Sequence, residues 1–142
     1  MWPVSFSEQI SPLIGRWVLA WYFLSAAWDR ATHWNTTMTL MAMQHVPAPP
    51  VLLALALIVM ILGGLSLFLG YHTRHGAMLL FGFTAVVTVA MHNFWTIHNP
   101  SDRAADYELF ACNVAIAGAL LLLVGMGAGP FALDNNQKKG RR

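Results

Sequence analysis

A cluster of polar and aromatic residues could hold the head group of a lipophilic molecule. His92, Asn93 and Trp95 stand together at the end of one long apolar stretch, and Asn113 lies near the start of the next. Their imidazole, amide and indole groups form hydrogen bonds, and a histidine beside aromatic rings suits the head of a quinone. We therefore expect His92, Asn93, Trp95 and Asn113 to form a quinone or lipid pocket. The alternative is a purely structural role at the end of a helix bundle.

Methionine and histidine side chains form a second pattern, which is compatible with copper(I). Met38, Met41 and Met43 have the spacing MxxMxM, and His45 follows them. Thioether and imidazole groups are ligands that copper(I) accepts. Because methionines in an apolar helix are far more often lipid contacts, we predict no metal site here and keep copper as the minor alternative.

Motifs of self-sufficient enzymes are absent from the sequence. It contains no nucleophile–base pair, no Walker or Rossmann glycine motif and no pair of carboxylates within an apolar stretch. Cys112 is the only cysteine, which excludes disulfides and dithiol chemistry within the chain. We expect a protein that is not catalytic by itself and whose only candidate cofactor is a quinone or a bound lipid.

Four long apolar stretches must position these residues. They cover about 13–28, 51–69, 77–95 and 109–127, and only the first contains a charged residue, Arg16, which we expect to reach the lipid head groups. A helix needs about 20 apolar residues to cross a bilayer. With 57% hydrophobic and 10% charged residues, the composition is that of a membrane protein. We predict an all-α, up-down bundle of four transmembrane helices in a single domain, 1–142, with a basic tail, 128–142.

Local signals mark where the helices begin and where they pack closely. Pro49 and Pro50 are placed to begin the second span, residues 37–43 suit a short helix at the membrane interface, and Ser101 or Asp102 could cap the helix of the last span. Small residues within the spans permit close helix contacts. These are Gly63, Gly64, Gly82 and Gly118, together with Ala111, Ala115 and Ala119.

Basic residues predict the orientation in the membrane. One side of an even-span bundle carries Arg16, Arg74 and the four basic residues of the tail, whereas the other carries only Arg30 and Arg103. By the positive-inside rule both termini are then cytoplasmic. The tail residues, Lys138, Lys139, Arg141 and Arg142, suit an anionic lipid surface, and nothing indicates nucleic acid as a partner.

A series of short motifs, in order along nearly the whole chain, resembles the DoxX family. The motifs are Gly15-Arg16, Val46-Pro47-Ala48-Pro49, Leu62-Gly63-Gly64, Leu69-Gly70, Thr73-Arg74, His92-x-Phe94-Trp95, Asn113 with Gly118, and Gly127-x-Gly129 followed by Leu133-Asp134. The resemblance implies a four-helix protein of the bacterial cytoplasmic membrane. It also implies a link to membrane-associated oxidoreductases, because related DoxD-type chains are subunits of a thiosulfate:quinone oxidoreductase.

Two positions depart from the family pattern. Where relatives commonly carry an acidic residue before the paired glycines, this chain has Met60, and where they carry a lysine before the asparagine, it has Cys112. If those charges pair in relatives, this chain has lost both partners, which is less costly than losing one. A proton-relay role of such a pair therefore does not transfer to this chain.

Together these observations predict a subunit or accessory protein of a membrane-bound oxidoreductase complex, with the bilayer and other subunits as its partners. The main alternative is a structural or assembly subunit that packs against partner helices and binds no ligand. A transporter is a weaker alternative, because four spans without internal repeats or central charges offer little basis for alternating access.

Overall fold

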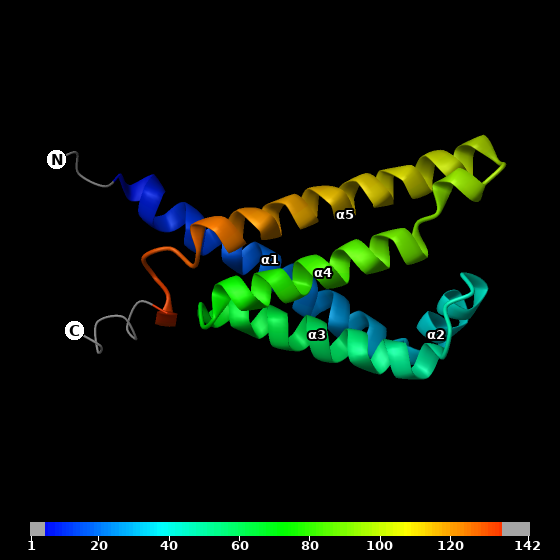
Figure 1. The fold of residues 1–142 in the computed structure, drawn as a ribbon, viewed down its shortest axis with the longest axis horizontal. Coiled ribbons are helices and arrows are strands. Elements are labelled where there is room, and N and C mark those ends of the chain that lie inside the picture. The colour runs from blue at the N-terminus through cyan, green and yellow to red at the C-terminus, as the bar shows by residue number, and fades with distance from the viewer. Residues whose placement is uncertain (1–4, 135–142) are drawn as a thin grey trace.

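The computed structural model describes residues 5–134, which form five α-helices and one short 3-10 turn (Figure 1). The helices are α1 (Phe6–Thr32), α2 (Trp34–Met43), α3 (Pro49–Leu69), α4 (Thr73–Met91) and α5 (Pro100–Met126), and the turn η1 (Phe94–Thr96) follows α4. Four segments containing α1, α3, α4 and α5 are long and apolar enough to cross a membrane. The chain is a multi-pass membrane protein, and the predicted all-α bundle of four spanning helices is confirmed.

The four long helices pack in a row that leaves one side of the bundle open. α1 packs along α3, α3 along α4, and α4 along α5, as the connectivity of an up-down bundle requires (Figure 1). α1 and α5 share no extended interface. The first and last helices are therefore separated over much of their length, and the candidate site lies in this region.

The prediction of close packing at small residues is confirmed for α3. A Cβ atom on Gly63 would collide with the side chain of Leu80 on α4, and one on Gly64 would lie 2.9 Å from Leu24 on α1. α3 thus contacts both neighbours through adjacent glycines. The same prediction is wrong within this chain for Gly82 and Gly118, because both face open space with no atom within 4 Å of an added Cβ.

The helix starts agree with the sequence in one case and differ in another. α3 begins at Pro49 and Pro50, as expected. The backbone N–H groups in the first turn of a helix have no partner within the helix, and proline has no such group to leave unpaired. α5 begins earlier than expected, and its cap is Asn99, whose side-chain oxygen accepts from the backbone N–H of Ser101. The expected caps at Ser101 and Asp102 are wrong because the helix already includes both residues. Residues 37–43 are helical within α2, as predicted.

Arg16 does not reach the lipid head groups, which corrects the expectation from sequence. Its side chain is 2% exposed, and its guanidinium donates to the carbonyl oxygens of Ala128 and Phe131, at 2.8 Å for Phe131. Both carbonyls belong to the segment that follows α5. Burial of an arginine is tolerated here because these carbonyls replace part of its hydration. The segment after α5 is thereby attached to α1.

The same segment also caps α4. The Asp134 carboxylate accepts hydrogen bonds from the backbone N–H groups of His72, at 2.7 Å, and Thr73, at 3.0 Å, and the Asp134 N–H donates to the carbonyl of Gly70. Burial alone would raise the pKa of this carboxyl, but the two backbone N–H groups and the nearby His72 side chain hold it below its usual value. The four basic residues of the tail, Lys138, Lys139, Arg141 and Arg142, lie beyond the described residues.

Candidate functional site

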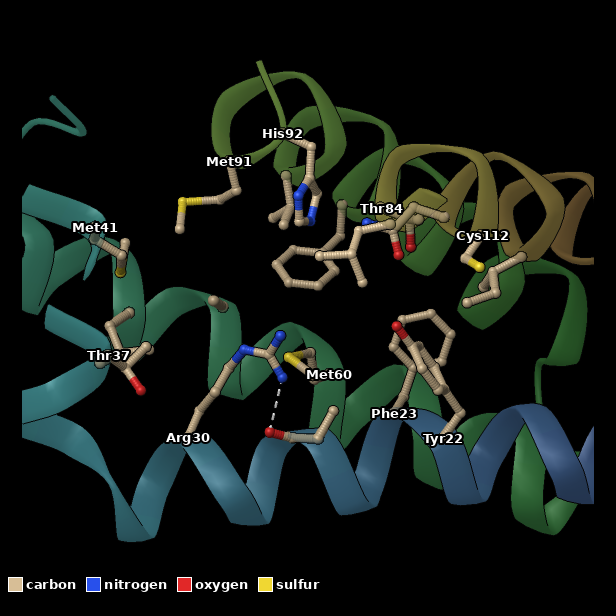
Figure 2. Close-up of a pocket in the computed structure, with 18 of the residues that line it drawn as sticks. Tyr22, Phe23, Arg30, Thr37, Met41, Met60, Thr84, Met91, His92 and Cys112 are labelled. Carbon is tan, nitrogen blue, oxygen red and sulfur yellow. Dashed lines mark hydrogen bonds between the residues drawn. The ribbon is translucent and has the colours of Figure 1, made fainter. Parts of the chain in front are cut away.

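A cavity of about 530 Å³ lies among α1, α3, α4 and α5, with α2 beside one end (Figure 2). Its apolar walls come from the four long helices and include Phe23, Leu53, Met60, Phe83, Val87, Leu109 and Ile116. Its polar groups include Tyr22, Arg30, Thr37, Thr84, His92, Asp106, Cys112 and Asn113. A mainly apolar cavity with a few polar groups has the usual character of a small-molecule site.

The strongest polar groups occupy the end of the cavity nearest α2. Arg30 stands in the last turn of α1, His92 follows the last residue of α4, and Asp106 lies near the start of α5. In an up-down bundle these helix ends lie at one level of the membrane. The cavity therefore has a polar end and an apolar interior, as an amphipathic ligand would require.

His92 and Asp106 form a hydrogen-bonded pair at this end. The Nδ1 atom of His92 lies 2.9 Å from Oδ1 of Asp106, and the two side chains are only 20% and 17% exposed. The second carboxylate oxygen of Asp106, Oδ2, is buried and has no hydrogen-bond partner among the described residues. The pair joins α4 to α5 and leaves the Nε2 atom of His92 without a hydrogen bond in the described part of the chain.

Arg30 points into the cavity from the opposite wall (Figure 2). One of its terminal nitrogens donates to the carbonyl oxygen of Ala26 at 3.0 Å. Within residues 5–134 no carboxylate lies close enough to Arg30 to form an ion pair. The remaining N–H groups of its guanidinium, which carries five donors in total, are available to a ligand.

The cavity includes two of the four residues that the sequence nominated. His92 and Asn113 line it, whereas Asn93 and Trp95 do not. Trp95 packs instead against the rings of Phe94 and Phe110 at the surface of the bundle, with centroids 5.2 and 6.4 Å apart. The structure thus separates the four predicted residues into a cavity-lining pair, His92 and Asn113, and a pair outside the cavity, Asn93 and Trp95.

The methionines of the copper alternative do not converge on the cavity. Only Met41 lines it, and Met43 is largely exposed. Among residues 5–134 no group of three or more histidine, cysteine, aspartate or glutamate side chains is arranged to hold a metal ion.

Arg30 and Asp106 were not identified as site residues from the sequence, because both lie outside the predicted apolar stretches. Both lie within helices that continue beyond the apolar stretches, since α1 and α5 are 27 residues long. One signal was available, because Asp106 and Asn113 are seven residues apart and so lie on one face of a helix. Met60 and Cys112, the two positions that depart from the family pattern, both line this cavity.

Comparisons with known proteins identify relatives along most of the chain. The sequence profile of the DoxX family matches residues 11–93. Inner membrane protein YqjF of Escherichia coli is 27% identical over 89% of this chain and 92% of its own length, and inner membrane protein YphA of the same organism is 28% identical over 86% of each chain. The ER-derived vesicles protein ERV29 of Saccharomyces cerevisiae is 28% identical over 55% of this chain but only 25% of its own length. No solved structure matches the chain.

Proposed function

The chain belongs to the DoxX family, and on this basis we propose that it is a membrane subunit or accessory protein of an oxidoreductase complex whose cavity binds a quinone or lipid. One observation carries the ligand part of the proposal. A cavity of about 530 Å³ has mainly apolar walls and has Arg30, His92 and Asp106 together at one end. A quinone or lipid combines a polar head with an apolar tail and so matches both parts.

The open side of the bundle gives such a ligand a route from the bilayer. The cavity is lined by residues of both α1 and α5, and these helices share no extended interface. A lipophilic molecule that is dissolved in the membrane could then enter sideways between them without crossing water. In this proposal the described residues bind and orient the head group, and the other subunits of the complex carry the redox reaction.

The proposed orientation places the polar end of the cavity on the outer side of the membrane. Arg16 and Arg74 lie toward the end of the bundle where α1 begins and α5 ends, and Arg30 and Arg103 lie at the opposite end. The positive-inside rule then places both termini in the cytoplasm. The relatives named as inner membrane proteins support the bacterial cytoplasmic membrane as its location.

Binding of a short-tailed quinone to the purified protein in lipid nanodiscs tests the ligand part. We expect Arg30→Ala and Asn113→Ala, which remove side-chain donors from the cavity, each to weaken binding about 10-fold, the usual cost of removing a buried hydrogen-bonding group. Trp95→Phe is the matched control, because Trp95 belongs to the nominated cluster but lies outside the cavity. Unchanged affinity in both alanine variants would contradict the proposed pocket.

A structural or assembly role is the second candidate, and the exposure of α5 favours it. Only 6% of the most apolar stretch of α5 is buried, compared with 22–28% in the other spans. Ala111 and Ala115 lie exposed on this helix, where a partner helix could approach closely. If this role is correct, Ala115→Leu releases co-purifying subunits while quinone binding stays unchanged.

A further inference from the structure

The pair of His92 and Asp106 determines which kind of head group the cavity accepts. We propose that the site binds the reduced hydroquinone form of its ligand in preference to the oxidised quinone, with His92 accepting a hydrogen bond from the ligand hydroxyl. This inference rests on the proposed function and adds the chemical form of the ligand. The preference follows from the 2.9 Å contact between Nδ1 of His92 and Oδ1 of Asp106.

The Asp106 carboxylate fixes the position of the hydrogen on the His92 imidazole. A carboxylate is ordinarily ionised at neutral pH and can then only accept hydrogen bonds. Because Oδ1 of Asp106 lies 2.9 Å from Nδ1 of His92, the hydrogen between them belongs to Nδ1. In a neutral imidazole the other nitrogen, Nε2, then carries a lone pair and acts as an acceptor.

This wall of the cavity therefore presents a hydrogen-bond acceptor to a ligand. Nε2 of His92 is an acceptor that has no hydrogen bond within the described residues. Oδ2 of Asp106 is enclosed by protein atoms and so is not presented to a ligand. A quinone carbonyl oxygen is also only an acceptor, so it would face an acceptor here without a hydrogen bond. A hydroquinone hydroxyl can donate to Nε2, and this difference separates the two redox forms.

The opposite wall of the cavity presents hydrogen-bond donors from Arg30. Arg30 carries donors only, and either a carbonyl or a hydroxyl oxygen can accept from it. It therefore contributes to binding both forms and does not distinguish them. Thr37 and Asn113 can donate or accept and fit either form.

Binding of a short-tailed ubiquinol and of the ubiquinone with the same tail, measured without oxygen on the full chain in nanodiscs, tests the inference. We expect the ubiquinol to bind about 10-fold more tightly, because sites built for a hydroxyl donor reject analogues that lack it. Asp106→Asn should lose most of this preference, since an amide can donate as well as accept and no longer fixes the hydrogen on Nδ1. Glu108→Gln, an exposed acid-to-amide change on the same helix, should keep it.

A nitrogen-15 NMR spectrum of the histidine rings provides a measurement that needs no variant. We expect His92 to carry its hydrogen on Nδ1, and a hydrogen on Nε2 in the neutral ring would overturn the inference. Equal affinity for the two redox forms would overturn it too and leave the proposed quinone site intact. Full preference in Asp106→Asn would also overturn it. Failure of both forms to bind the unaltered protein would refute the inference and the proposed ligand together.

Discussion

The contact between Gly63 on α3 and Leu80 on α4 provides a direct test of the helix packing that forms the cavity. In Gly63→Ala the new Cβ would lie 2.7 and 2.9 Å from the two methyl carbons of Leu80 and closer still to its Cγ. Carbon atoms normally stay about 3.5–4.0 Å apart. Leu80 is completely buried, so it has no free space into which to turn. The two helices must therefore separate or Leu80 must adopt a strained rotamer.

The expected cost follows from two opposing effects. Overpacking of a core usually costs about 1–3 kcal/mol. Replacing a helical glycine by alanine recovers about 0.5–1 kcal/mol of backbone entropy. We therefore expect Gly63→Ala to lower the free energy of unfolding by about 1–2 kcal/mol.

Gly82→Ala on α4 is the matched control. It lies inside the neighbouring helix, but its added Cβ meets no atom within 4 Å, so only the backbone effect remains. We expect it to raise stability by about 0.5–1 kcal/mol. Reversible unfolding in mixed micelles with rising SDS, followed by circular dichroism, measures both variants. If the two changes shift the unfolding midpoint equally, or if Gly63→Ala is as stable as the original protein, the packing described for α3 and α4 is wrong.

Three further predictions concern the segment after α5 and the cavity. The lowered pKa of Asp134 means that its stabilisation is complete above the carboxyl's unfolded pKa and is lost as the pH falls through the folded pKa. Asp134→Asn leaves one acceptor oxygen for two backbone N–H groups, so it should cost about 1 kcal/mol at pH 7 and less at pH 3, and an equal loss at both pH values would contradict the cap. Arg16→Ala should cost about 2–4 kcal/mol and expose the segment after α5 to proteases, so unchanged cleavage would refute the attachment. Bound quinone should slow alkylation of Cys112 by a membrane-permeant maleimide, and an unaltered rate would place the ligand elsewhere.

The sequence predicted the spanning helices well because the signal is local. Each uncharged stretch satisfies its own backbone hydrogen bonds in a bilayer, so length and composition alone identify a spanning helix. The start of α3 at Pro49 follows from the same kind of local chemistry. Helix ends were less accurate, because α1 and α5 continue past their apolar stretches into charged residues such as Arg30 and Asp106.

The role of Arg16 shows where local reasoning fails. A lone arginine near the end of an apolar stretch ordinarily reaches toward lipid head groups. Here its partners are carbonyls of Ala128 and Phe131, more than a hundred residues away in the chain. No pattern around Arg16 indicates such partners, because any residue's backbone can supply a carbonyl.

The sequence alone predicted a membrane protein and the number and order of its spanning helices, and it singled out His92 and Asn113, which line the cavity. These features could be predicted because hydropathy and residue chemistry are properties of short segments. Only the tertiary structure decided that His92 pairs with Asp106, that Arg30 faces them across a cavity, and that Trp95 stands outside it. The physical reason is that these relations depend on the rotation and spacing of packed helices. Packing of side chains such as Leu80 against Gly63 sets that spacing, and such contacts join residues far apart in the chain.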